Sequence, residues 1–365
     1  MAAALQSAPG TQRVVELREP LRVFIADDLH AGKWDEFVDR QPDATLFHGW
    51  QWREAVRCTF GHEPFYVIAQ ENRRVVGVLP LFLVRSLLAG RLLVSVPYAV
   101  YGGPLVEETR VAGALREAVC EIAERHRVCQ IEIRSLHAAW PDLPVIDDRY
   151  ATFQKPLPKN VSDVLAELPR KARAAARNAR DKYRLTVTEG DEQLREVWLL
   201  YSRSMRRLGS PNYPFRFFSE LLERTPGRHV VTMVRRNGKP AAGLVSFVYR
   251  DTLMPYFAGC DERLERFCPN NLLYLSAMEW GVNEGLRRFD FGRSRRNNRG
   301  SFDFKRHQGF EPEPLCYQVW MPRGGSGTNL TPDNARLQWA IGIWRRMPLW
   351  MTRPLGAYTA RSIPG

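Results

Sequence analysis

The sequence lacks the residue spacings that identify several common kinds of site. Its six cysteines form no Cys-x-x-Cys pair and no cysteine–histidine cluster with the spacing of a zinc site. It contains no Walker-type phosphate loop and no Gly-x-Ser-x-Gly nucleophile elbow. The run Asp290-Phe291-Gly292 matches the magnesium motif of protein kinases, but the catalytic and glycine-rich loops that accompany it there are missing. We therefore exclude these classes and expect no metal site.

Long apolar runs are also missing. The longest spans residues 75–84 and contains Pro80, which is too short for the roughly 20 residues that cross a bilayer. The first residues, Met-Ala-Ala-Ala-Leu-Gln-Ser, form too short an apolar run for a signal peptide. Unpaired cysteines in a chain of this length are typical of a reducing compartment. We therefore predict a cytoplasmic protein and leave open a contact with the inner face of the membrane.

Positive charge, in contrast, is abundant. The 365 residues include 53 basic and 40 acidic ones, which gives a formal charge of +13 and a sequence pI near 9.7. Such a balance favours anionic partners, which include nucleic acid, phosphorylated carriers and an acidic membrane face. A solvated basic surface explains the same balance equally well. The length predicts about two domains, at roughly 150 residues each.

An internal duplication organises the chain. A helix, a hairpin, a strand, a second helix and a further strand follow one another twice, at an offset of about 160 residues. Val75-Val76-Gly77-Val78-Leu79 matches Ala241-Ala242-Gly243-Leu244-Val245, and each glycine comes ten residues after an apolar strand position (Val67 and Met233). Ile131 to Ser135 matches Phe289 to Ser294 with one insertion. The sequence thus predicts two copies of one α/β unit.

The domain boundaries follow from proline and glycine. We predict a disordered lead over residues 1–20, a first domain over 21–157 and a second over 158–321, divided at Lys155-Pro156-Leu157-Pro158-Lys159. A linker with Gly324-Gly325-Ser326-Gly327 and a tail rich in tryptophan and arginine occupy 322–365. That tail has two explanations, docking on anionic lipid and packing on the domain.

Several motifs together resemble the Fem-type transferases. They are Leu168-Pro-Arg-Lys-Ala-Arg173, Tyr256-Phe-Ala-Gly259, Pro269-Asn-Asn-Leu-Leu-Tyr274, Phe289-Asp-Phe-Gly-Arg-Ser294 and Phe304-Lys-Arg-His-Gln-Gly-Phe310, with Leu46-Phe-His-Gly-Trp-Gln-Trp52, Thr59-Phe-Gly-His62 and Tyr101-Gly-Gly-Pro104 in the first half. More narrowly, the chain looks like the FemAB-related proteins associated with bacterial exopolysaccharide and exosortase loci. The resemblance covers roughly residues 20–320.

This resemblance implies a fold and a reaction. The expected fold is α/β (α+β), with tandem duplicated GNAT-like acyltransferase domains, each a mixed twisted sheet flanked by helices whose central strand splays from its neighbour. The implied reaction moves an activated acyl or aminoacyl group onto an amine of an anionic or lipid-linked sugar precursor by direct attack. The donor is a co-substrate (aminoacyl-tRNA or an acyl thioester), and no cofactor is tightly bound. A non-catalytic nucleotide-sugar or RNA-binding module on the same fold is the alternative.

The stretch from Arg288 to Phe310 contains the candidate catalytic residues. Phe289 and Phe291 alternate with Asp290 as in a strand, and a basic loop precedes Phe304 and Lys305. The resemblance implies that Lys305 lies near the reacting carbonyl, where an ammonium would stabilise the oxyanion by about 3–4 kcal/mol. The alternative is a surface lysine in a β-bulge.

Nine further residues are candidates for substrate binding, each with a competing structural role. Asp290 either orients a donor or pairs with Arg293, and Tyr101 and Tyr256 either contact substrate or pack in the core. A helix that starts near Asn271 either binds an anion through its amides or is capped by Asn270 and Asn271. The candidates are Tyr101, Arg173, Arg177, Tyr256, Asn270, Asn271, Asp290, Arg293 and Ser294.

Two features depart from the family pattern or stay ambiguous. The loop that binds the pyrophosphate of coenzyme A in GNAT enzymes is glycine-rich, whereas here it reads Arg263-Leu-Glu-Arg-Phe-Cys-Pro-Asn-Asn271. We therefore do not expect coenzyme A to bind in the usual way. Arg173, Arg177, Arg180 and Arg184 are spaced 4, 3 and 4 residues apart, so a regular helix would place them on one face. That face either binds the phosphates of a carrier or tRNA or is simply solvated.

Overall fold

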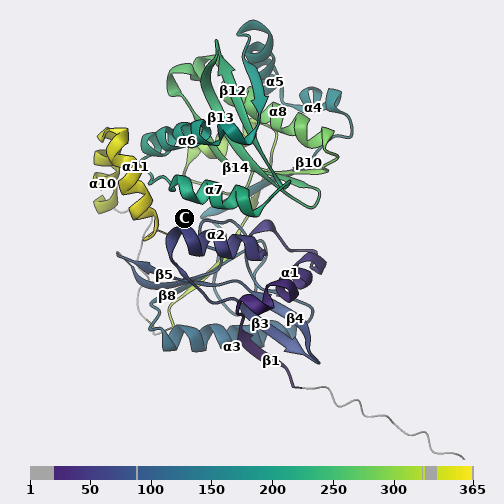
Figure 1. Ribbon diagram of the computed structural model, residues 1–365, viewed down its shortest axis with the longest axis vertical. Helices are drawn as coiled ribbons and strands as arrows, with labels where there is room; N and C mark the ends of the chain where they lie inside the picture. The colour runs from purple at the N-terminus through teal and green to yellow at the C-terminus, as the bar shows by residue number, and fades with distance from the viewer. Residues whose placement is uncertain (1–19, 88, 323, 325–334, 364–365) are drawn as a thin grey trace, which may run out of the picture.

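The computed structural model describes residues 20–87, 89–322, 324 and 335–363. Two α/β units are stacked end to end, and a pair of helices from the C-terminal part of the chain lies along one side (Figure 1). Most of the predicted lead (1–20) and of the linker after residue 322 falls outside the described residues.

The second unit is built on one large sheet. Its strands run in the order β11-β12-β13-β14-β15-β10-β16, and β17 also pairs with β10. They are β10 (Tyr150–Pro156), β11 (Thr186–Glu189), β12 (His229–Arg236), β13 (Lys239–Tyr249), β14 (Thr252–Cys260), β15 (Arg288–Asp290), β16 (Ser294–Arg295) and β17 (Pro312–Pro314). Alternating side chains serve two cores: Val231 and Met233 face one side of β12, and Val230 and Val234 face the other.

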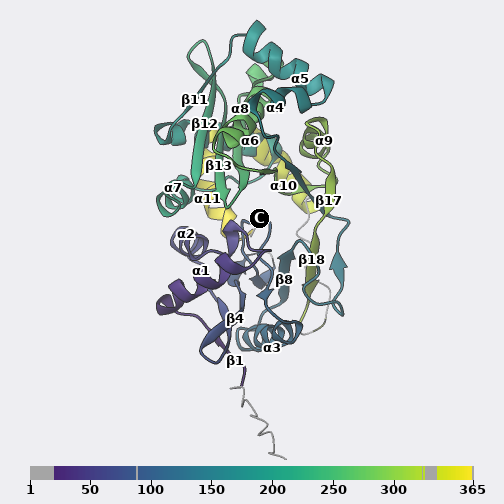
Figure 2. The same ribbon diagram turned by 90° about the vertical axis from the view of Figure 1, so that its right-hand side faces the viewer.

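Helices cover both faces of this sheet. Those on the outer face are α4 (Val161–Glu167), α5 (Arg170–Arg177), which continues into a π-helical turn (Asn178–Lys182), and α8 (Pro269–Asn283). Those on the face toward the first unit are α6 (Leu194–Leu208) and α7 (Phe215–Arg224). The short helix α9 (Arg299–His307) lies at one edge (Figure 2).

The first unit contains two smaller sheets. One has the order β1-β3-β4-β7 and the other β2-β5-β6-β8-β18-β9. The strands are β1 (Arg22–Ile25), β2 (Glu63–Pro64), β3 (Val67–Glu71), β4 (Arg74–Leu79), β5 (Phe82–Ser86), β6 (Gly90–Val94), β7 (Leu105–Val106), β8 (Gln130–Ser135), β9 (Val145–Ile146) and β18 (Cys316–Trp320). The helices are α1 (Ala31–Arg40), α2 (Trp50–Phe60) and α3 (Thr109–Arg125). The apolar run 75–84 forms two strands, because Pro80 has no N–H for a sheet ladder.

The two units exchange strands. β10 follows the first unit in sequence but pairs antiparallel with β15 of the second. β18 follows the second unit but pairs antiparallel with β8 of the first (Figure 2). The predicted division at 157/158 would therefore assign β10 to the first unit and β18 to the second, although each strand pairs in a sheet of the other unit. Lys155 and Pro156, the first two residues of the segment predicted as a proline-broken linker, are the end of β10.

The order of the elements agrees with the predicted duplication, apart from additional strands in the first unit. In the second unit the hairpin β12–β13 is followed by β14, α8 and β15, whereas in the first unit β5, β6 and β7 all stand between the hairpin β3–β4 and α3. In both units a helix connects two parallel strands, since β6 pairs parallel with β8 and β14 with β15. The hairpin registers differ, because Gly77 lies opposite Ala69 whereas Gly243 lies opposite Met233. The equal ten-residue spacing in the sequence therefore does not correspond to equal pairing.

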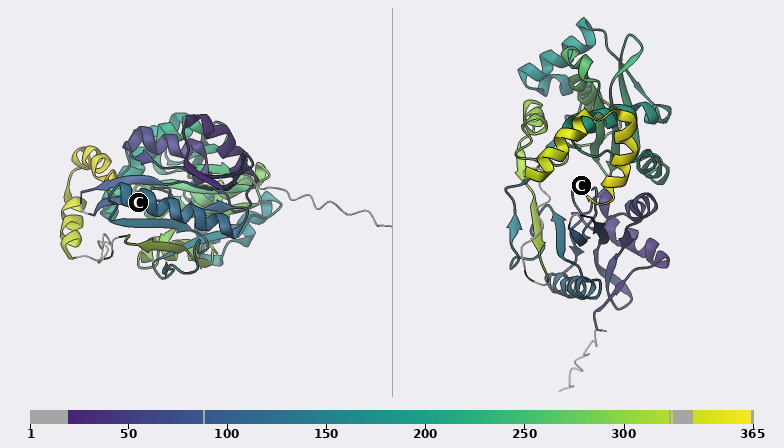
Figure 3. Two further views of the ribbon diagram at one scale, coloured as in Figure 1. Left: turned by 90° about the horizontal axis from the view of Figure 1, so that it is seen from below. Right: turned by 90° about the vertical axis from the view of Figure 1, so that its left-hand side faces the viewer.

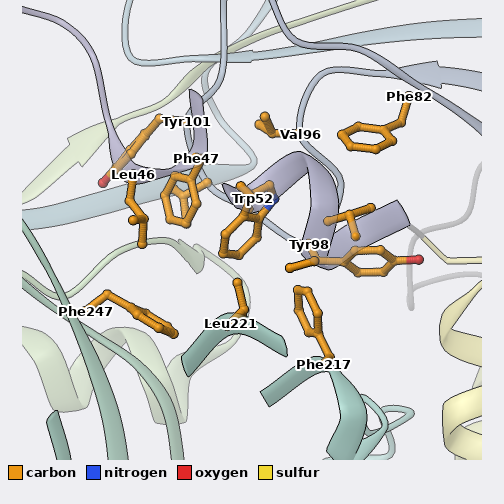
Figure 4. Packing of buried hydrophobic residues seen from close by; sticks show 14 of the residues in the cluster. Leu46, Phe47, Trp52, Phe82, Val96, Tyr98, Tyr101, Phe217, Leu221 and Phe247 are labelled. Carbon is orange, nitrogen blue, oxygen red and sulfur yellow. The ribbon is translucent and has the colours of Figure 1, made fainter. Parts of the chain in front are cut away.

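One hydrophobic core spans the contact between the units. Figure 4 shows Phe47, Trp52 and Tyr98 of the first unit facing Phe217 and Leu221 of α7. The rings of Trp52 and Phe217 have centroids 5.6 Å apart, and both side chains are fully buried. Aromatic packing of this extent ties the units together.

The C-terminal helices α10 (Ala335–Arg346) and α11 (Leu349–Ala360) pack on α6 (Figure 3). Pro348 directly precedes the first residue of α11. The Trp344 Nε1 donates to the carbonyl of Ser210 at 3.1 Å, and the Tyr98 hydroxyl donates to that of Ala360 at 2.9 Å. Of the two explanations for the tail, packing on the domain therefore holds for its inner face. Among the described residues, no helix combines the length and apolarity needed to cross a bilayer.

Candidate functional site

The second sheet opens at its centre. β14 and β15 pair in parallel only at Thr252–Arg288 and Leu253–Phe289. β15 then ends at Asp290, held on its other side by β10, while β14 continues along β13 to Cys260. The predicted splay of the central strand is therefore present. Beyond this point the edge of β14 faces the opening, in which backbone groups lack a neighbouring strand among the described residues.

A β-bulge marks this part of β14. The β13–β14 register shifts between Val245 and Ser246, whose partners are Phe257 and Pro255, so that Tyr256 is the extra residue. Burial raises the pKa of Tyr256 well above its usual value, and its hydroxyl donates to the carbonyl of Tyr98 in the first unit. Of its two proposed roles, the structure gives Tyr256 the packing contact.

Asp290 lies buried at the end of β15. Its Oδ1 accepts from the Gly292 N–H at 2.7 Å and from the Tyr101 hydroxyl at 3.1 Å, and its Oδ2 accepts from Gln154 Nε2 at 3.1 Å. Since the one Tyr101 proton is directed to Asp290, the Thr152 hydroxyl donates to the Tyr101 oxygen. The network thus joins a loop of the first unit to strands β10 and β15 of the second.

Burial raises the pKa of Asp290, but the carboxylate still predominates at pH 7. Burial raises its pKa to about 6, although the hydrogen bond from Gly292, that from Tyr101 and the charge of Lys305 all favour the carboxylate. The predicted pair between Asp290 and Arg293 is not among its contacts. Instead, Arg293 lies over the Tyr150 ring at 4.6 Å, and its Nη1 donates to the Tyr317 hydroxyl at 3.3 Å.

Lys305 lies on helix α9, not in a loop or bulge. Asn298 caps this helix by accepting from the Ser301 N–H, and Ser294 Oγ bonds Ser301 Oγ at 2.9 Å. The Lys305 side chain is only 8% exposed. Its Nζ donates to the carbonyls of Phe291, Gly292 and Arg293 at 2.7, 2.9 and 3.1 Å.

These three bonds bear on the predicted role of Lys305. An ammonium has three protons, and here each one is directed at a backbone carbonyl. Direct donation to an oxyanion, as the resemblance implies, would require one of these bonds to break. Burial lowers the pKa of Lys305 to about 7, while the charge of Asp290 opposes that shift. The neighbouring candidate Phe304 packs its ring on Tyr274 of α8, with centroids 5.5 Å apart.

The helix start at Asn270 and Asn271 lies at the end of the β14–α8 connection. A 3₁₀ helix (Glu262–Phe267) replaces the glycine-rich loop, and Cys268 adopts the left-handed conformation directly before Pro269. The Asn271 N–H donates to the carbonyl of Cys268 at 3.1 Å. Both asparagines are half-buried, and neither caps α8 through its side chain, since the capping position is Cys268.

The arginine stripe is interrupted. The π-helical turn adds a residue to the turn after Arg177, so Arg180 and Arg184 leave the face that regular helical spacing predicts. Arg180 Nη2 donates to both carboxylate oxygens of Glu279 on α8 at 2.8 Å, and Arg173 Nη1 donates to the carbonyl of Ala166 at 3.1 Å. Arg177 is exposed. The structure thus does not bring Arg173 and Arg177 into the Asp290–Lys305 cluster.

Sequence reasoning missed four members of this cluster. Three of them, Tyr150, Thr152 and Gln154, lie on β10. The fourth is Tyr317 on β18, and its hydroxyl donates to the carbonyl of Val100 at 2.6 Å. The run Tyr150-Ala-Thr-Phe-Gln-Lys155 alternates with the period of a strand, a signal hidden by the prolines that follow it. Within the described part of the chain, no group of three His, Cys, Asp or Glu is placed to hold a metal ion.

A family model and several solved structures both support the fold. Residues 163–306 match the family model described as an acetyltransferase (GNAT) domain. The crystal structure of FemX superposes with a TM-score of 0.62 at 15% identity, over 82% of this chain and 97% of that one. This chain has a tandem GNAT fold. A search of curated proteins by sequence found no match.

Two further solved structures share this tandem GNAT fold. A tandem GNAT protein from the clavulanic acid biosynthesis pathway has a TM-score of 0.55 at 15% identity, over 84% of this chain and 100% of that one. L-PGS from Bacillus licheniformis has a TM-score of 0.53 at 14% identity, over 89% and 99%. The Fem-type resemblance seen in the sequence is therefore supported at the level of fold.

Proposed function

We propose that this protein is a Fem-type N-acyl- or aminoacyltransferase that acts in the cytoplasm on an amine of a cell-envelope or exopolysaccharide precursor. The observation that carries the proposal is the opening between β14 and β15 beside the Tyr256 bulge. It lies within the part of the chain that matches the acetyltransferase family, residues 163–306. The second unit would perform the chemistry, and the first would help to bind the acceptor.

Direct attack accounts for the reaction without a covalent enzyme intermediate. The neutral amine nitrogen of the acceptor attacks the activated carbonyl carbon, and a C–N bond forms. The C–O bond of an aminoacyl ester or the C–S bond of a thioester then breaks. The proton lost by nitrogen balances the proton taken up by the departing alkoxide or thiolate. The requirement on the protein is to align the two substrates and to stabilise the negative oxygen of the intermediate.

The contacts of Lys305 support a positioning role at this site. Its ammonium holds three successive carbonyls at the end of β15, while Asp290 holds the Gly292 N–H of the same turn. The turn at one side of the opening is thus fixed from two directions. A protonated Lys305 also places positive charge near the opening, where low polarity strengthens its effect on a developing oxyanion.

The connection after β14 supports a donor other than coenzyme A in its usual pose. Residues 261–268 contain no glycine, and they include Asp261, Glu262 and Glu265. The charges of these carboxylates are offset by Arg203, Arg207 and Arg263, whereas the lack of glycine limits how closely backbone amides approach a pyrophosphate. Aminoacyl-tRNA, or an acyl thioester held differently, fits the net positive charge of the chain.

A donor and acceptor screen on the purified full-length protein tests the proposal. Thermal shift would be measured with aminoacyl-tRNA, coenzyme A thioesters and nucleotide-linked amino sugars, because a ligand that binds the folded state raises the melting temperature. Donor–acceptor pairs that bind would then be incubated together with the protein, and the molecular mass of the acceptor would be measured by mass spectrometry. We expect one acyl or aminoacyl group to be added to the amino sugar.

Variants at Lys305 make this experiment specific. We expect Lys305→Ala to lower the rate of transfer by about a hundredfold or more. Lys239→Ala, at an exposed lysine in the β12–β13 hairpin, should leave the rate unchanged. Equal turnover of Lys305→Ala and the wild type would refute the role of Lys305. Salt-sensitive binding of tRNA or a nucleotide sugar without any transfer would instead favour the non-catalytic binding module.

A further inference from the structure

The helix pair α10–α11 has an outer face that is apolar and exposed. Among the described residues, large hydrophobic side chains with high exposure are concentrated here, and Trp339 and Trp350 are both 74% exposed. The spacing fits the helical repeat on both helices. The outer face consists of Trp339 and Ile343 on α10 and of Trp350, Leu355 and Tyr358 on α11.

The inner face of the pair is firmly seated, so the outer one is not needed for packing. Gly356 lies directly against Asn212, where an added Cβ would be 2.4 Å from the side-chain oxygen. The Asn212 side chain donates to the carbonyl of Arg353, and Arg206 donates to that of Met347 at 3.2 Å. The tryptophans of the outer face are thus held in place on a rigid support.

The charge of this segment is of one sign. Residues 335–365 contain no aspartate and no glutamate. Arg346, at the end of α10, is exposed next to the outer face, whereas the neighbouring Arg345 donates from Nη2 to the carbonyl of Leu208 on the inner side at 3.3 Å. The arginines of the segment are Arg336, Arg345, Arg346, Arg353 and Arg361.

We infer that the outer face of α10–α11 docks on the surface of an anionic lipid bilayer. Tryptophan and tyrosine favour the boundary between lipid headgroups and acyl chains, since one part of each ring system is apolar and the other is polar. Arginines beside them are attracted to anionic headgroups. A helix pair that lies in the plane of the membrane needs no spanning segment. This proposal does not depend on the reaction that the second unit performs.

Docking would also orient the molecule. The end of α11 reaches the junction of the two units, where Arg361 Nε donates to the carbonyl of Phe60 at 2.9 Å. The pair extends from there along the second unit (Figure 3). The side of the molecule that contains this junction would therefore face the bilayer.

Cosedimentation of the full-length protein with vesicles tests the inference. One set of vesicles would be phosphatidylcholine alone, and the other three parts phosphatidylcholine to one part phosphatidylglycerol. We expect binding to the anionic vesicles only. The triple variant Trp339→Ser/Trp350→Ser/Tyr358→Ser should bind at least about tenfold more weakly, because aromatic area no longer leaves water. Arg346→Glu should weaken binding by about fivefold or more.

Matched variants elsewhere on the surface act as controls. Leu29→Ser/Leu87→Ser removes two leucines that are 90% and 75% exposed, and Arg125→Glu reverses a charge at the end of α3. Both should bind the anionic vesicles as the wild type does. The inference is overturned if the wild type binds neither set of vesicles, or if the triple variant binds unchanged. A dimer in sedimentation velocity that the triple variant dissociates would assign the outer face to a second copy of the chain.

Discussion

Lys305 combines a buried charge with a complete set of hydrogen-bond acceptors. Its three carbonyl partners and the nearby Asp290 favour the ammonium, whereas burial favours the neutral amine and lowers its pKa to about 7. The same lysine therefore couples the geometry of the turn at 291–293 to pH. A sequence pattern identifies such a residue but does not tell whether its protons point to substrate or to backbone.

The pH dependence of unfolding measures this coupling. The pKa of Lys305 is 10.5 in an exposed reference and about 7 when folded, so the unfolded state binds more protons between these values. Stability should therefore rise with pH across this window, by up to about 1.4 kcal/mol per pH unit for one fully coupled proton. Urea unfolding at a series of pH values would measure it.

Comparison with a variant isolates the contribution of the single group. Lys305→Met keeps much of the side-chain length but has no proton to lose, so its stability should lack this rise. Lys239→Met, at an exposed position, should follow the wild type. If the profiles of the wild type and Lys305→Met run parallel, Lys305 remains charged throughout the window.

At the scale of elements, helix α6 approaches β14 unusually closely. A Cβ on Gly259 would lie 2.1 Å from the Tyr201 nitrogen and 2.3 Å from the Leu200 carbonyl carbon. These are backbone atoms of a helix and cannot move without the whole helix. The glycine in the motif Tyr256-Phe-Ala-Gly259 thus allows the helix to pack on the strand that borders the opening.

Substitution of Gly259 should separate these two elements. We expect Gly259→Ala to destabilise the protein by about 3 kcal/mol or more, since the added methyl has no space. Gly113→Ala on α3 is the matched control, because no atom lies within 4 Å of its added Cβ. It should stabilise the helix by about 0.5–1 kcal/mol. Equal urea midpoints for the two variants would contradict the close approach.

Local sequence predicted those elements whose signals are local. The hairpin at Asn237-Gly238 is one, since this residue pair is typical of tight hairpin turns and both residues have the positive φ that such a turn requires. Helix α9 was not predicted, because the sequence analysis expected a basic loop before Phe304 and overlooked Asn298 as a helix cap. β10 was hidden by Pro156 and Pro158. Its place beside β15 depends on a partner more than a hundred residues away, which no local pattern contains.

The same limit applies to the candidate site. Asp290, Tyr101 and Lys305 were identified individually, and the structure brings all three together. Arg173 and Arg177 were grouped by helical spacing alone, and a π-helical turn breaks the stripe that the spacing predicts. Contacts that cross between the units, such as that between Tyr101 and Asp290, follow from the exchange of strands and are not encoded in the spacing of either motif.

At the scale of the whole molecule, the exchanged strands make the two units interdependent. β8 needs β18 as its neighbour, and β15 needs β10. The aromatic core across the junction adds to this connection. The six-stranded sheet of the first unit is incomplete without β18, and the large sheet of the second unit is incomplete without β10.

Calorimetry should therefore show a single unfolding transition. Ile133→Ala on β8 and Phe289→Ala on β15 both remove fully buried side chains, one from each unit. Each should cost about 2–5 kcal/mol and lower the melting temperature of that one transition. Leu29→Ala, at a 90% exposed position, should leave it unchanged. Two transitions, each sensitive to only one of the core variants, would show that the units unfold separately.

The position of β18 near the end of the described chain also affects how the protein is made. A ribosome releases residues 130–135 long before residues 316–320, so the nascent first unit emerges with one edge of β8 unpaired. Unpaired strand edges recruit other strands and favour aggregation. In the completed molecule β18 pairs along this edge of β8 and covers it. In the growing chain this edge stays open, so we expect the nascent first unit to need chaperones until β18 has been made.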